Sequence, residues 1–187
     1  MATATTPQQA GITAEQFAAR PDPGYPEELV RGRIVRMSPP GARHGQICNR
    51  MARFLGNYAE EHDTGHALCN DSGVITERDP DSVLGADVSY YSYDRIPRGP
   101  LPVQYPAVAP ELVVEVRSPS DRWPKVLAKV AEYLEAGVGV VCVLDDASRT
   151  ARVFDAEGLV RILGEADELT FPELLPGFGV RVGRFFD

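Results

Sequence analysis

The segment over residues 111–117, Glu-Leu-Val-Val-Glu-Val-Arg, is an almost unbroken run of aliphatic side chains. Such a run is typical of a central strand that is buried on both faces, as in α/β domains. Because side chains alternate along a strand, Glu115 shares one face with Val113, while Val114 and Val116 share the other. An ionised glutamate in this position costs free energy unless a cation or strong hydrogen-bond donors meet it. The sequence therefore predicts an α/β domain whose central strand carries a glutamate in need of a partner.

Asp87 poses the same problem, because it opens a second apolar strand predicted over residues 87–91. Two acids from adjacent buried strands can share one hard cation, and Mg²⁺ favours one or two carboxylates together with several waters. The alternative is that Glu115 forms a salt bridge with Arg117 or with another arginine. Both interpretations of Glu115 stay open at this point.

The chain holds only two lysines, Lys125 and Lys129, against seventeen arginines, and both lie in a helix predicted over residues 122–136. Asp121 is expected to cap this helix. A helix packed directly after the Glu115 strand can direct the Lys129 ammonium toward a metal-bound water. The alternative is an exposed Lys129 that pairs with Glu132, which helical spacing alone does not reject.

The remaining pattern predicts short strands, tight turns and one further long helix. A short helix capped by Thr13 starts the domain. The other elements are a hairpin over residues 28–31 and 33–37, an amphipathic helix over 44–61, strands over 67–69 and 74–77, a proline-rich loop over 95–110, a strand over 138–144, a hairpin over 149–154 and 159–163, and a tail over 174–186 that is a loop with a final short element.

Length and composition fit one globular domain, since 187 residues suffice for a single core. We expect a disordered lead over residues 1–12 and a single domain over residues 13–187. No stretch approaches the roughly eighteen apolar residues of a membrane span, and the polar start lacks a secretory pattern. A cytoplasmic location without membrane association is therefore the expectation. The net charge of −8 argues against avid non-specific nucleic-acid binding, although an acidic protein can contain a locally basic cleft.

Three scattered cysteines indicate reduced thiols and not a disulfide framework. A zinc site built from His62, His66 and Cys69 is disfavoured. Gly65 interrupts any helix that would align the two histidines, and no fourth ligand lies nearby in the sequence.

Several motifs run through almost the whole chain in a recognisable order. They are residues 28–30 with Gly32, the Met-Ser-Pro-Pro-Gly segment at 37–41 with His44, then 86–88, 109–116, 118–121, Lys129 with Tyr133, 136–138 and 175–178. Together they resemble the Uma2 (DUF820) family of restriction-endonuclease-like proteins, within the PD-(D/E)XK nuclease superfamily. The stretch over residues 111–138 is the most specific part of the resemblance.

The resemblance implies a restriction-endonuclease-like core, in which a mixed central β-sheet is flanked by helices and extended by N-terminal and C-terminal hairpins. It also implies hydrolysis of DNA phosphodiester bonds with Mg²⁺ as cofactor and Mn²⁺ as a substitute. By position, Asp87 and Glu115 would be the metal ligands, together with the backbone carbonyl of Val116. A homodimer is expected, because two copies of one site suffice to cut both strands of a duplex.

The superfamily's lysine usually stands two residues after the glutamate, where this chain has Arg117. The resemblance moves that role to the following helix, at Lys129, which would orient the attacking water or stabilise developing charge. Arg117 is a weaker catalytic candidate because a guanidinium stays charged and exchanges no proton. Glu28 and His44 are further candidates, for a second metal or for positioning water; the alternative for His44 is packing at a helix start.

Two positions depart from the family pattern. Ala86 replaces the proline that usually precedes the aspartate, and Cys142 replaces a frequent aromatic residue. Neither change removes a group with a chemical role.

Two rival functions stay open at this stage. One is a binding module that keeps the nuclease fold without cleaving anything, which the acidic net charge favours. The other is a metal-dependent hydrolase of a different phosphoester. The three residue types of the candidate site favour an enzyme over the binding module.

Overall fold

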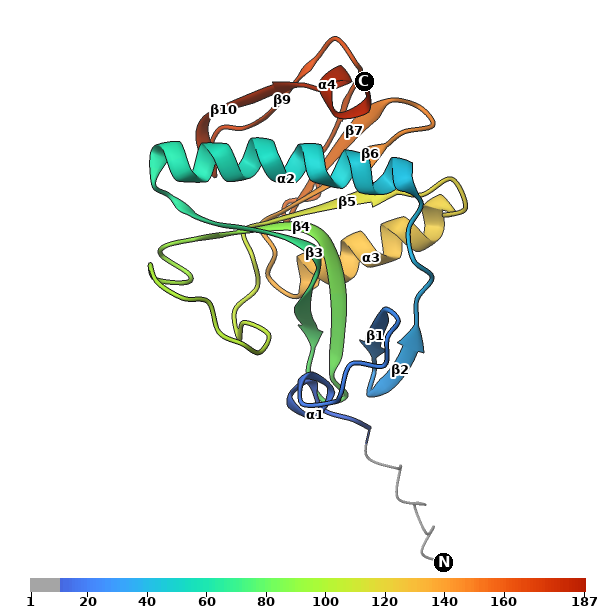
Figure 1. Cartoon of the computed structure of the whole chain (residues 1–187). Coiled ribbons are helices and arrows are strands. Elements are labelled where there is room, and N and C mark those ends of the chain that lie inside the picture. The colour runs from blue at the N-terminus through green and yellow to red at the C-terminus, as the bar shows by residue number, and fades with distance from the viewer. Residues whose placement is uncertain (1–10) are drawn as a thin grey trace, which may run out of the picture.

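The strand predicted over residues 111–117 forms β5 (Leu112–Arg117), in the middle of an eight-stranded sheet. Figure 1 shows the computed structural model, in which residues 11–187 are described. The strand order is β2-β1-β4-β5-β6-β7-β8, and β3 pairs with β4 beside this path. Only β5 and β6 pair in parallel, and every other pair within residues 11–187 is antiparallel. The predicted mixed sheet is therefore confirmed.

The remaining elements follow the predicted order closely. They are α1 (Ala14–Ala18), β1 (Glu27–Val30), β2 (Arg33–Arg36), α2 (Ala42–His62), β3 (Gly65–Glu77), β4 (Ser82–Ser92), α3 (Trp123–Glu135), β6 (Val140–Asp145), β7 (Thr150–Asp155), β8 (Val160–Leu163), β9 (Glu168–Phe171), β10 (Leu175–Arg181) and α4 (Gly183–Phe186). The Thr13 capping box and the hairpins β1–β2 and β7–β8 are confirmed.

Helices cover both faces of the sheet (Figure 1). On one face, α2 packs Ile47, Met51 and Leu55 against Val114 and Val116 of β5, and the hairpin β9–β10 with α4 completes this layer. On the other face, α3 packs Val130 and Tyr133 against Val113 and its neighbours. The alternation predicted for residues 111–117 therefore holds, and Glu115 points to the α3 side with Val113.

A bulge bends the long β3–β4 ribbon next to Asp87. The register shifts between Cys69 and Ser72 of β3, and two bulge residues, Asn70 and Asp71, have φ values of 69° and 54°. A bulge leaves an extra residue on one strand and increases the local twist. The ribbon therefore turns away from the central sheet at Asp87, as the curved β3 and β4 in Figure 1 show.

Two strand predictions need correction at this ribbon. The strands predicted over residues 67–69 and 74–77 are one continuous strand, β3, because the polar residues between them form the bulge and not a turn. Asp87 does not open its strand but lies in the middle of β4. Ser82 and Gly85 interrupt the apolar residues of the first half of β4, which is why the sequence did not indicate a strand there.

Two further predictions fail near helix and chain ends. Asp121 does not cap α3, whose N-cap is Arg122 without a side-chain hydrogen bond. The Asp121 carboxylate instead accepts from the Ser118 N–H at 3.1 Å and closes the preceding turn. The tail predicted as a loop contains β10, which accommodates Gly177, at φ 86°, through a register shift in its pairing with β9.

The start of the chain is only partly described. Of the disordered lead predicted over residues 1–12, residues 1–10 lie outside the described range, while the Ile12 N–H donates to the Gly32 carbonyl at 3.0 Å. No helix within residues 11–187 is both long enough and apolar enough to cross a membrane.

The packing of α2 predicts opposite effects for two neighbouring substitutions. Leu55 is fully buried, so Leu55→Ala should lower the free energy of unfolding by about 2–5 kcal/mol, as expected for a cavity in a packed core. Gly56 has open space where a Cβ would stand, so Gly56→Ala should raise it by about 0.5–1 kcal/mol through helix propensity. Urea unfolding measures both, and equal effects of the two variants would contradict the packing described.

Candidate active site

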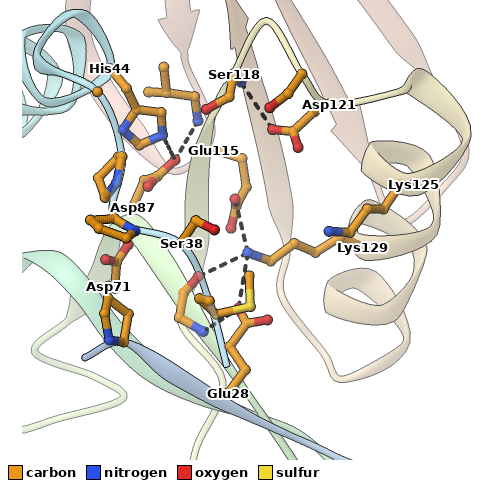
Figure 2. A pocket seen from close by; sticks show the side chains of 18 of the residues that line it. Glu28, Ser38, His44, Asp71, Asp87, Glu115, Ser118, Asp121, Lys125 and Lys129 are labelled. Atoms are coloured by element: carbon orange, nitrogen blue, oxygen red, sulfur yellow. Dashed lines mark hydrogen bonds and ion pairs between the residues drawn. The ribbon is translucent and has the colours of Figure 1, made fainter. Parts of the chain in front are cut away.

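The candidate site lies where β4 and β5 separate. Their pairing ends at Val88 and Val114, so the carboxyl end of β5 and the first half of β4 diverge beyond that point. A cavity of about 600 Å³ opens there, walled by the β1–β2 hairpin, the segment over residues 37–41, the start of α2 and the exposed side of α3. Six of the predicted residues line it: Glu28, His44, Asp87, Glu115, Val116 and Lys129. Figure 2 shows the labelled side chains among them converging from different elements.

Asp87 is held in the gap between the two strands. Its Oδ2 accepts the Val116 backbone N–H at 2.6 Å, so the carboxylate takes the place of the missing strand acceptor. His44 Nε2 lies 3.3 Å from the same oxygen, and this contact raises the pKa of His44. Within a strand, the N–H and C=O of one residue point to the same side. The Val116 carbonyl therefore also faces the gap that Asp87 fills.

Glu115 occupies the opposite side of the cavity and has two strong donors. Its Oε2 receives Lys129 Nζ at 3.1 Å, and its Oε1 receives the Tyr133 hydroxyl at 2.8 Å. Lys129 and Tyr133 are one turn apart on α3, so one helix face supplies both donors. Burial, together with the nearby Asp87 carboxylate, raises the pKa of Glu115 to about 7 despite the lowering effects of Lys129 and Tyr133. The carboxyl group is therefore poised between its two charge states near neutral pH.

Lys129 reaches from α3 into the cavity, as Figure 2 shows. Besides Glu115, its ammonium contacts the Gly85 carbonyl at 3.0 Å and Glu28 Oε1 at 3.4 Å. Burial lowers its pKa, but Glu115 and Glu28 outweigh burial, so the net pKa is raised and the group stays charged. The alternative of an exposed Lys129 paired with Glu132 is wrong, because Glu132 accepts from the Thr76 hydroxyl at 2.6 Å instead.

Arg117 is not among the residues that line the cavity. Its guanidinium bonds to Oδ1 of buried Asp145 at 2.6 Å and lies over the Trp123 ring. The alternative in which Arg117 neutralises Glu115 is therefore wrong. The two side chains share a strand face, but their partners lie on different neighbouring elements.

The sequence did not identify three residues of this site: Asp71, which lines the cavity, and Tyr133 and Cys48, which contact residues that line it. Asp71 reaches the cavity through the β3 bulge, and burial followed by the Asp87 carboxylate raises its pKa. The Tyr133 hydroxyl was read only as part of a motif. Cys48 lies one helical turn after His44, with Sγ 3.4 Å from His44 Nδ1. The four-residue spacing of His44 and Cys48 was the available sequence signal for Cys48. No sequence signal indicated the β3 bulge that brings Asp71 to the cavity.

The charge balance of the cavity fits a divalent cation. Six carboxyl groups line it, those of Glu27, Glu28, Asp71, Asp87, Glu115 and Asp121, against the basic side chains of Arg36, His44, Lys125 and Lys129. Burial, and then repulsion from the nearby Asp87 carboxylate, raises the pKa of Asp71 and of Glu115. Oxygen-rich sites with surplus negative charge are those that Mg²⁺ and Mn²⁺ occupy.

Comparisons with known proteins show the family and the fold of the chain. A family model named Uma2, described as "Putative restriction endonuclease", matches residues 14–183, so the chain belongs to the Uma2 family. A crystal structure of a "putative nuclease belonging to DUF820" from Anabaena variabilis has the same fold, with a TM-score of 0.80 and 18% sequence identity. The match covers 94% of this chain and 97% of that one. A search among curated proteins finds no match.

The position of Arg117 predicts a structural role. Arg117→Ala should lower the free energy of unfolding by about 1–3 kcal/mol, because the buried Asp145 carboxylate loses its charged partner. Divalent-metal binding should be unchanged, because the guanidinium lies away from the cavity. Arg181→Ala, at an exposed arginine, is the matched control and should change stability by less than about 0.5 kcal/mol. Loss of metal binding in a stable Arg117→Ala protein would contradict this placement.

Proposed function

We propose that this protein is a Mg²⁺-dependent endonuclease that hydrolyses DNA phosphodiester bonds, with Mn²⁺ able to replace Mg²⁺. The observation that carries the proposal is the pairing of Lys129 with Glu115 inside an acidic cavity that Asp87 also lines. Membership in the Uma2 family supports a nuclease. The proposal further includes a single domain over residues 13–187, a cytoplasmic location and a homodimer that presents one site to each strand.

Asp87, Glu115 and the backbone carbonyl of Val116 would hold the cation. When bound, a divalent cation polarises a phosphate oxygen and lowers the pKa of a water ligand. Contacts with neighbouring residues hold these ligand oxygens in place. Asp87 is held by the Val116 N–H and His44, and Glu115 is held by Tyr133. A cation bound there would therefore require little rearrangement of the two side chains.

Lys129 would stabilise negative charge that develops on the phosphate and would orient the attacking water. Because its pKa is raised, it acts as a fixed positive charge and donor, not as a base. Its contacts with Gly85 and Glu28 hold the ammonium in place before substrate arrives. The missing side chain of Gly85 leaves room for Asp71, since a Cβ there would lie 3.0 Å from the Asp71 Cβ.

Glu28 and His44 would then be positioning residues. Glu28 accepts the Gly85 N–H at 3.1 Å and contacts Lys129, and His44 contacts Asp87. Arg36 and Lys125 line the outer part of the cavity, where cations can meet phosphates of a DNA strand. A locally basic rim of this kind reconciles DNA binding with the net charge of −8.

The net charge favours one alternative, a nuclease fold that binds a partner without cleaving it. A metal-dependent hydrolase of another phosphoester is the other. Metal calorimetry separates a binding module that takes up no metal from the two enzymes. A cleavage panel of DNA, RNA and nucleotide substrates then separates the enzymes from each other.

Metal binding provides the first test of the proposal. Asp87→Asn and Glu115→Gln should each weaken Mn²⁺ binding at least about tenfold, or ~1.4 kcal/mol, because each removes a charged oxygen ligand. Isothermal titration calorimetry measures the change. Asp94→Asn and Glu135→Gln make the same chemical changes at exposed positions and should leave binding intact. Equal Mn²⁺ affinity in all four variants and the parent would sink the ligand assignment.

Cleavage tests the role of Lys129. Lys129→Ala should lower the rate of Mg²⁺-dependent nicking of plasmid DNA by about 10²–10⁴-fold, because a preorganised charge is lost. Lys125→Ala, one turn earlier, should mainly raise KM, since that residue lines the outer cavity. Circular dichroism should show both variants folded. Full nicking activity in Lys129→Ala would remove this residue from the mechanism.

A further inference from the structure

One group of side chains in the cavity has a chemistry that the magnesium proposal does not use. Within residues 11–187, His44, Cys48 and Asp87 are the one set of three histidine, cysteine or acidic residues whose ligand atoms lie within 4.8 Å of one another. His44 and Cys48 are one turn apart on the same face of α2, and Asp87 comes from β4 opposite. These three residues therefore link α2 to β4, the strand that carries Asp87.

The ligand atoms of the three side chains are close enough together to converge on one metal ion, since they lie within 4.8 Å of one another. Sγ of Cys48 lies 3.4 Å from His44 Nδ1, and Oδ2 of Asp87 lies 3.3 Å from His44 Nε2. Zinc takes sulfur at about 2.3 Å and nitrogen or oxygen at about 2.0–2.2 Å, which places tetrahedral ligands about 3.4–3.6 Å apart. Cys48 and Asp87 contact different nitrogens of the His44 ring, so metal binding would require side-chain rotations that bring one imidazole nitrogen, the sulfur and a carboxylate oxygen to face a common point.

The ligand types differ in kind from those proposed for Mg²⁺. Hard cations select carboxylate, carbonyl and water oxygens, whereas a thiolate with an imidazole selects Zn²⁺ or Co²⁺. Burial, and then the carboxylates of Asp87, Asp71 and Glu115, raises the pKa of the Cys48 thiol, and the same negative potential attracts a cation. On ligation the Cys48 thiol proton passes to solvent and the thiolate bonds to the metal.

We propose that His44, Cys48 and Asp87 form a second metal site, for a thiophilic divalent cation of the zinc class. Three protein ligands leave the fourth position open to water or to a substrate oxygen. Because Asp87 belongs to both sites, a zinc-class ion and Mg²⁺ compete for one carboxylate. Zn²⁺ bound to His44, Cys48 and Asp87 would therefore interfere with Mg²⁺ binding in the same cavity.

Cobalt spectroscopy on the whole chain tests this site without any measurement of cleavage. Co²⁺ replaces Zn²⁺ in such sites, and a cobalt–thiolate bond produces a near-ultraviolet charge-transfer band. Titration with Co²⁺ should produce this band and saturate at one ion per chain, and Zn²⁺ should abolish it by displacement. Failure of DNA cleavage would leave this result unaffected, because the band reports ligation alone.

Matched variants test whether the charge-transfer band comes from Cys48. Cys48→Ser should abolish it, while Cys69→Ser, at an exposed cysteine of β3, should retain it. His44→Gln keeps the thiol, so it should keep the band and weaken Co²⁺ binding at least about tenfold. This second variant keeps the test decisive if Cys48→Ser does not fold. No charge-transfer band in the parent, a band that survives in folded Cys48→Ser, or unchanged affinity in His44→Gln would each overturn the proposal.

Discussion

The buried contact of Glu115 with Lys129 and Tyr133 is the interaction on which the rest of the cavity depends. A carboxylate on the central strand is tolerable only because α3 supplies an ammonium and a hydroxyl from consecutive turns. Those donors also bond to the Gly85 carbonyl, which ties α3 to β4. The same contacts that satisfy a buried charge therefore fix the distance between the helix and the two strands that form the cavity.

The separation of β4 from β5 turns this buried pair into an accessible site. If the ladder continued past Val88 and Val114, backbone atoms would fill the space that Asp87 now occupies. The β3 bulge bends the ribbon at that point and brings Asp71 into the same wall. The cavity thus concentrates acidic groups at a place where solvent and a phosphate can enter. An excess of carboxylates over cations is costly without a metal ion and suited to binding one.

Sequence reasoning succeeded where local pattern determines structure. The aliphatic run around Glu115, the stripe of α2 and the β1–β2 hairpin each follow from period and turn residues, and all three form. The spacing of residues in α3 did not predict the partners of Lys129. Helical periodicity shows which residues share a face, but not which element that face packs against. Asp71 and Cys48 depend on a bulge and on how α2 docks across β4. The bulge has no local signature, and the four-residue spacing of His44 and Cys48 does not show how α2 docks.

The central claim is that Asp87 and Glu115 share a divalent cation beside Lys129. The most direct test is a crystal structure soaked with Mn²⁺, using the anomalous signal to locate the ion. The account predicts an anomalous peak between the Asp87 and Glu115 carboxylates, in reach of the Val116 carbonyl, with Lys129 still at the edge of the cavity. A cavity without such a peak at millimolar Mn²⁺, with Lys129 and Tyr133 still bound to Glu115, would contradict it.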